Sequence, residues 1–197
     1  MKSDYLHPSL YQKLFGVMQW PNVLAIRVSL ETGLRIDDVL SLRPENLRAR
    51  SISFTAKKTG KSGTKKISSD LARHLRACAG KDWLFPGRDP AKHRTRQTVW
   101  RDVKKAARVQ GISGQISPHS ARKSYAVELR KEEGLAAVQR ELQHSNAETT
   151  NLYAFADVLT GERTQGNGLR NLVISPENME IFAEMIAEKV FSRLKKQ

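Results

Sequence analysis

The sequence predicts a mainly α-helical protein with one small antiparallel β-sheet, an α+β fold. Apolar residues recur at intervals of three and four along most of the candidate elements, which is the spacing of one helix face. Only the segment 51–67 alternates apolar and polar side chains, as a half-buried strand does. A glycine-containing turn divides that segment, so its two halves are expected to pair with each other.

The first third of the chain is expected to be helical. Apolar residues at helical spacing predict one helix over 10–18, and Pro21 opens a second that runs to Leu30. Gly33 interrupts this pattern just before Arg35, and a short helix is expected to follow as far as Leu42.

The β segment and two further helices come next. Ile52, Phe54 and Ala56 indicate the first strand, 58–63 a turn and 64–67 the returning strand. Helices are expected over 69–77 and 94–109, joined by a loop that contains Trp83, Phe85, Pro86 and Gly87.

A further helix start lies at Ser117 and Pro118, which supply a hydroxyl N-cap and a proline in the first turn. His119 and Arg122 are three residues apart on this helix, so their side chains face the same way.

Another helix is expected to start just after His144, because Ser145 and Glu148 form a capping box. The break matters because one unbroken helix would place His144 and Tyr153 on opposite faces. With the break, both side chains can converge on one phosphate.

Three segments of the chain resemble the sequence boxes of the tyrosine recombinases, the phage integrase family. They are TGLRIDDVLSL at 32–42, SPHSAR at 117–122 and LQHSNAETTNLY at 142–153, and they stand in the family's order. The resemblance implies a tyrosine recombinase catalytic-domain fold in a protein of mobile or integrating DNA. It also implies site-specific recombination through a 3′-phosphotyrosyl intermediate, with no metal, ATP or other cofactor.

The same resemblance implies a role for each residue of the boxes. Tyr153 would be the nucleophile, and Arg35 and Arg122 would bind the non-bridging oxygens of the scissile phosphate. His119 would be the general base, and His144 would add a hydrogen bond to the phosphate. A structural ion pair with a neighbouring aspartate is the alternative for Arg35.

A lysine of the hairpin would protonate the leaving 5′ oxygen. Lys58, in a Lys-Thr-Gly sequence, best matches the family pattern, while the other candidates are Lys57, Lys61, Lys65 and Lys66. Asp38 falls where the family commonly has an acid that supports the Arg35 loop, although it can also be a local helix charge.

The net charge favours a polyanionic partner. The chain has 34 Lys and Arg against 20 Asp and Glu, a formal charge of +14 and a pI near 10.2. Charge alone would equally suit a ribosomal or other basic protein. Double-stranded DNA is the expected partner. The residues expected to contact it are Lys57, Lys61, Arg94, Arg96, Arg101 and Lys123. The alternative is that such side chains form a basic face exposed to solvent.

Three regions are expected along the chain. Residues 1–158 would form the catalytic domain, 159–174 a linker and 175–197 a C-terminal helix with an apolar stripe. In the resembled family this helix docks on a neighbouring protomer, which implies a tetramer on paired DNA sites and a monomer without DNA. Packing of the helix against its own domain is the alternative. The roughly 30 residues before Gly33 are too few for the family's N-terminal core-binding domain.

Other features of the sequence indicate where in the cell the protein is found. A single cysteine, no apolar run of about 20 residues and no signal-peptide core predict a cytoplasmic protein without a membrane partner. Relaxation of supercoils, as by type IB topoisomerases, and a non-catalytic DNA-binding role are the competing functions.

Overall fold

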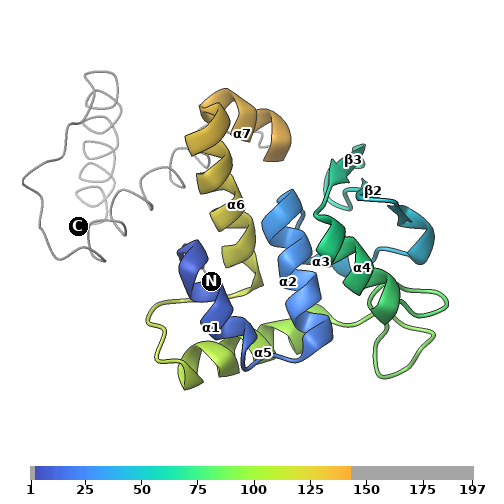
Figure 1. Ribbon diagram of the computed structural model, residues 1–197, viewed down its shortest axis with the longest axis horizontal. Coiled ribbons are helices and arrows are strands. Elements are labelled where there is room, and N and C mark those ends of the chain that lie inside the picture. The colour runs from blue at the N-terminus through green and yellow to red at the C-terminus, as the bar shows by residue number, and fades with distance from the viewer. Residues whose placement is uncertain (1–2, 143–197) are drawn as a thin grey trace, which may run out of the picture. The chain divides into compact units, whose positions relative to one another are not determined.

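The computed structural model describes residues 3–142, and two helices lie side by side at its centre (Figure 1). They are α2, Trp20–Thr32, and α6, Pro118–Glu133. The remaining helices are η1 Pro8–Leu10, α1 Tyr11–Phe15, α3 Ile36–Leu40, η2 Pro44–Asn46, α4 Ser69–Cys78, α5 Arg96–Val109 and α7 Leu135–Leu142. Three short strands, β1 Leu47–Arg48, β2 Ser51–Thr55 and β3 Ser62–Lys66, complete the expected α+β class.

Helix α2 is buried on nearly every side, which explains its continuous apolar sequence. Val23, Leu24 and Val28 are at most 2% exposed and belong to the main core. The helix ends at Gly33, whose φ of 70° is left-handed and whose N–H donates to the carbonyl of Ser29 at 2.9 Å. The predicted break before Arg35 is therefore present, and it turns the chain sharply into α3.

The sheet is antiparallel in the order β1-β2-β3. Ile52 and Phe54 are buried as the alternation predicts, and Ile52 pairs with Lys65 across β2 and β3. Gly63 lies opposite Phe54, where an added Cβ would come within 3.2 Å of the phenyl ring. The returning strand starts at Ser62, two residues earlier than predicted, because the turn itself lies earlier in the chain, after Thr55. Strand β1 was not anticipated.

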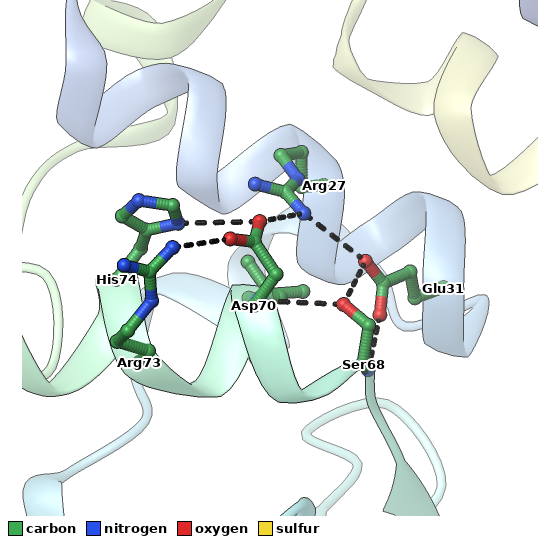
Figure 2. Close-up of polar contacts among 7 residues, drawn as sticks. Arg27, Glu31, Ser68, Asp70, Arg73 and His74 are labelled. Atoms are coloured by element: carbon green, nitrogen blue, oxygen red, sulfur yellow. Dashed lines mark hydrogen bonds and ion pairs between the residues drawn. The ribbon is translucent and has the colours of Figure 1, made fainter.

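A polar network joins the end of α2 to the start of α4 (Figure 2). Glu31 accepts hydrogen bonds from the N–H and the hydroxyl of Ser68, at 2.7 and 3.0 Å, and Arg27 Nη2 lies 3.0 Å from Asp70 Oδ2. Hydrogen bonds from Arg73 and then from Arg27 lower the pKa of Asp70, so its carboxylate stays ionised. The network holds the chain that leaves β3 against the helix that leads into Arg35.

The predicted starts of α5 and α6 are also observed. Thr95 caps α5 by accepting from the N–H of Thr98 at 3.2 Å, so the helix begins two residues later than expected. At α6 the Ser117 hydroxyl accepts from the N–H of His119 at 3.3 Å, while Ser120 Oγ accepts from the N–H of Ser117 at 3.1 Å. This reciprocal capping fixes the first turn of α6, which carries His119.

Helix α7 packs back on α6 and, with Tyr5, encloses a second apolar cluster. In the part of the chain from 3 to 142, no helix combines the length and apolar character needed to cross a membrane. The predicted linker and C-terminal helix lie outside the described residues.

Candidate active site

A pocket of about 570 Å³ lies where the starts of α3, α5 and α6 face the N-terminal segment. Two of the predicted catalytic residues, Arg35 and His119, line it. The full lining is Ser3, Arg35, Ile36, Asp37, Arg96, Gln97, Trp100, Lys104, Gln115, Ser117, Pro118 and His119. Cations outnumber anions in this wall, so the pocket suits a negatively charged group.

Arg35 stands at the N-cap of α3 with an extended backbone and a partly exposed side chain. The neighbouring acids make other contacts. Asp37 Oδ2 lies 3.2 Å from Arg96 Nη1, and Asp38 Oδ1 accepts from the N–H of Lys57 at 3.0 Å. Neither contact involves the Arg35 guanidinium, so among residues 3–142 the alternative ion pair of Arg35 with a neighbouring aspartate is not observed.

Arg122 is only 5% exposed, and its Nη1 donates to the carbonyl of Gly33. This bond ties α6 to the turn that ends α2, two residues before Arg35. His119 stands three residues earlier on α6 and is exposed at the pocket. The two sequence boxes, almost 90 residues apart, therefore meet around one turn of backbone.

Asp38 connects this turn to the β-hairpin. Its carboxylate is 4% exposed and holds the backbone of Lys57, which starts the exposed turn between β2 and β3. Lys58 is the next residue and is exposed. The hairpin turn is thus anchored to α3 one residue before the predicted general acid.

Lys65 lies deeper than the other hairpin lysines, with 15% of its side chain exposed. It forms an ion pair with Glu141 of α7, which also accepts from the hydroxyl of Tyr125 at 3.4 Å. Burial and then the charge of Arg122 lower the pKa of Lys65, against the opposing effect of Glu133. Lys65 is therefore close enough to Arg122 for their charges to interact.

The predicted DNA-binding residues divide into two groups. The side chains of Lys57, Lys61, Arg96 and Arg101 are exposed. By contrast, Arg94 is half-buried, donates to Asn22 Oδ1 at 3.3 Å and has a pKa lowered by burial, and Lys123 Nζ donates to the carbonyl of Ser3. These last two side chains hold parts of the protein together, and a DNA contact for either stays a prediction.

The N-terminal segment is fastened beside the pocket. The N–H of Asp4 donates to the carbonyl of Gln115 at 3.1 Å, and the N–H of Gln115 donates to Asp4 Oδ2 at 2.7 Å. Gly114, with a φ of 96°, leaves room for that carboxylate, which an added Cβ would approach to 2.8 Å. Ser124 Oγ donates to the carbonyl of Leu6 at 2.6 Å. The segment therefore supports the loop that leads into α6.

Trp100 and Gln115 are pocket residues that the sequence reasoning did not single out. Trp100 is 41% exposed although it is aromatic, and only the folded arrangement shows that it faces the same pocket as Arg35 and His119. The sequence did hold one signal for Trp100: its aromatic ring lies outside the apolar stripe of a helix that is otherwise basic. His144 and Tyr153 lie outside the described residues.

The sequence profile of the phage integrase family matches residues 6–158. A tyrosine recombinase of Pseudothermotoga lettingae is 32% identical over 162 residues, which cover 76% of this chain and 55% of that protein. The tyrosine recombinase XerD of Rhizobium meliloti is 33% identical over 140 residues, 65% of this chain and 45% of that protein. The chain thus spans about half the length of these curated relatives.

Solved structures agree on the fold. The catalytic domain of bacteriophage HP1 integrase gives a TM-score of 0.60 at 23% identity, covering 88% of this chain and 100% of that one. A lambda integrase dimer bound to a COC′ core site gives 0.66 at 18% identity, covering 89% of this chain and 52% of that one. With the family profile matching 6–158, a region that contains all three boxes, the chain belongs to the phage integrase family.

Proposed function

We propose that the chain carries the DNA-breaking and rejoining activity of a site-specific recombinase. One observation supports the proposal above the others. Arg35, His119 and Arg122 gather around the turn at Gly33, with the lysine-bearing hairpin held to the same turn through Asp38. This is a set of cations and one imidazole that can bind and activate a phosphodiester.

The chemistry is a reversible transesterification. The two guanidinium groups bind the non-bridging oxygens of the scissile phosphate and stabilise the charge that grows in the transition state. The phenol oxygen of Tyr153 attacks phosphorus and loses its proton to His119, while the bond from phosphorus to the 5′ oxygen breaks. A hairpin lysine gives that oxygen a proton. Reversal of these steps with another 5′ hydroxyl rejoins the strand without ATP.

Burial strengthens the contribution of Arg122. A guanidinium that is 5% exposed acts through a medium of lower effective dielectric than water, so its attraction for phosphate is screened less. Its bond to the carbonyl of Gly33 fixes the orientation of the planar group within the turn that precedes Arg35.

Metal ions have no part in this scheme. Across residues 3–142 no three His, Cys, Asp or Glu side chains are grouped so that they can hold a metal ion. The arginines, histidines and lysine supply the positive charge that metals supply in two-metal nucleases.

The test is a covalent-trapping experiment in excess EDTA. Duplex fragments from the DNA that flanks the gene, nicked so that the released end diffuses away, should give a denaturant-resistant protein–DNA adduct. Tyr153→Phe should form no adduct and keep DNA affinity within about threefold, because phosphate contacts dominate binding. Tyr125→Phe is the matched control and should still form it.

Two results would contradict the proposal. One is an adduct that persists in Tyr153→Phe, and the other is cleavage that EDTA stops and magnesium restores. Relaxation of supercoiled plasmids with no preference for a site would indicate the topoisomerase-like alternative. The absence of any adduct, with binding intact, would indicate a non-catalytic DNA-binding protein.

A further inference from the structure

Trp100 is exposed on a helix that already has its apolar face buried. Val99 and Val103 of α5 are at most 1% exposed and belong to the core, whereas Trp100 is 41% exposed and lines the pocket. Leaving an indole in water is unfavourable relative to burying it. The core therefore does not account for its position, and a flat apolar surface is presented beside the phosphate-binding residues.

The groups around this indole are those that bind nucleotides. Lys104 Nζ lies 5.8 Å from the centre of the Trp100 ring and donates to Gln115 Oε1 at 3.1 Å. Gln97 adds a second side-chain amide to the wall, and Arg96 adds a cation. An aromatic face for stacking, amides for base edges and cations for phosphate are the usual features of single-stranded nucleic-acid sites.

The size of the pocket also fits. A volume of about 570 Å³ lies within the range of pockets that hold small molecules, roughly 300–1,000 Å³. One nucleotide fits within this range, whereas a base pair within a duplex presents only its edges and backbone. A base can lie flat on the indole only after it has left its partner.

Strand exchange creates such a base. A strand that has been cut must unpair next to the break before it can pair with, and join, a new partner. Arg35, which would bind the cleaved phosphate, and His119, the proposed general base, line the same pocket as Trp100. We propose that Trp100 stacks on one unpaired nucleobase beside the cleaved phosphate and holds it during exchange, an inference that rests on the proposed recombinase function.

The experiment compares three fluorescently labelled DNAs by anisotropy at low salt. They are a 12-nucleotide oligothymidylate, a 12-unit abasic strand with the same phosphates, and a 12-base-pair duplex. Stacking tolerates any base, so no target sequence is needed. The intact chain should bind oligothymidylate more tightly than the abasic strand, and Trp100→Ala should remove that preference.

The expected loss for oligothymidylate in Trp100→Ala is about 5- to 100-fold, the effect of removing one stacking ring. Duplex and abasic affinities should change less than about threefold. Trp100→Phe should keep most of the preference, because a phenyl ring still stacks. Trp20→Ala is the matched control: Trp20 is 46% exposed, packs edge-on against His74 at 5.1 Å and does not line the pocket.

Circular dichroism and thermal melting of each variant would show whether the fold is kept. If Trp100→Ala does not fold, Trp100→Leu, which keeps an apolar side chain but has no ring, should remove the preference instead. Equal losses for the three DNAs would overturn the proposal and assign Trp100 to the duplex backbone. An unchanged affinity for oligothymidylate in Trp100→Ala would overturn it as well.

These outcomes are separate from the covalent-trapping result. If the intact chain shows no preference for oligothymidylate over the abasic strand but still forms the adduct, the nucleobase site is wrong and the proposed recombinase function is unaffected. If the preference for oligothymidylate depends on Trp100 but no adduct forms, the chain has a surface that binds single strands and the proposed recombinase function is wrong.

Discussion

Lys58 and Lys65, two of the hairpin lysines considered for the general acid, differ in what surrounds their ammonium groups. Lys65 is mostly buried, is paired with Glu141 and has a pKa lowered by burial and by Arg122. Lys58 is exposed on a turn that is anchored one residue earlier. A group that protonates a leaving oxygen must reach the DNA, and the ion pair with Glu141 holds Lys65 inside the protein. We therefore expect Lys58 to be the general acid and Lys65 to act on Arg122 through its charge.

A DNA substrate with sulfur in place of the leaving 5′ oxygen distinguishes the two lysines. A thiol ionises near pH 8.5, so the sulfur leaves without needing a proton. Lys58→Ala should lose about 10²- to 10⁴-fold in cleavage of the oxygen substrate, the usual contribution of a general acid, and should recover on the sulfur substrate. Lys65→Ala should be slow on both substrates. Recovery confined to Lys65→Ala would transfer the role to Lys65.

Among the elements, α3 and the hairpin depend on each other through Asp38. This carboxylate is 4% exposed and accepts the N–H of Lys57 at 3.0 Å. Asp38→Ala leaves that N–H without its acceptor, so we expect a loss of about 1–3 kcal/mol in the free energy of unfolding. Urea denaturation measures this loss, and covalent trapping should show slower cleavage because the turn before Lys58 is released.

Asp37→Asn is the control for this substitution. Asp37 is exposed and pairs with Arg96 at the surface, so its removal should change stability by less than about 1 kcal/mol. Equal effects of Asp37→Asn and Asp38→Ala would contradict the buttressing role of Asp38.

Local signals in the sequence were sufficient for much of the helical framework. Gly33 and the Ser117-Pro118 pair act on their own neighbourhood, and the structure has a break and a helix start at those positions. Strand β1 has two residues, too few for an alternation to be recognised. The half-buried position of Lys65 depends on its pairing with Ile52 across the hairpin and on its ion pair with Glu141 of α7, and the alternation of side chains shows neither.

Tertiary contacts account for the other features that the sequence did not predict. The sequence cannot show that Lys123 donates to the N-terminal backbone or that Arg94 reaches Asn22, because those partners are more than 70 residues away. The same holds for Trp100, whose exposure is set by how α5 packs on the core. A count of basic residues therefore identifies the class of partner and not the individual contacts.

For the whole molecule, the charge of +14 and the apolar stripe in 175–197 predict assembly on DNA. The stripe consists of Met179, Phe182, Ile186 and Val190, and a contact with a neighbouring protomer would be heterologous. Removal of residues 175–197 should leave a folded chain that binds one half-site but fails to bring two sites together. Native gels and sedimentation with DNA measure both properties.

Point variants separate the stripe from the helix as a whole. Phe182→Ala should impair pairing of sites, and Glu184→Ala, which lies off the stripe, should not. If the chain without residues 175–197 does not fold, the helix packs against its own domain, and the predicted contact with a neighbouring protomer is wrong.

The fastening of the N-terminal segment has a practical consequence. Ser3 lines the pocket and Asp4 is bonded to Gln115, so any polypeptide joined ahead of Ser3 emerges at the rim where DNA is expected to arrive. A bulky purification tag at that end would compete with the ligand for space. A small environment-sensitive dye attached there would instead report the arrival of DNA directly, without any label on the nucleic acid.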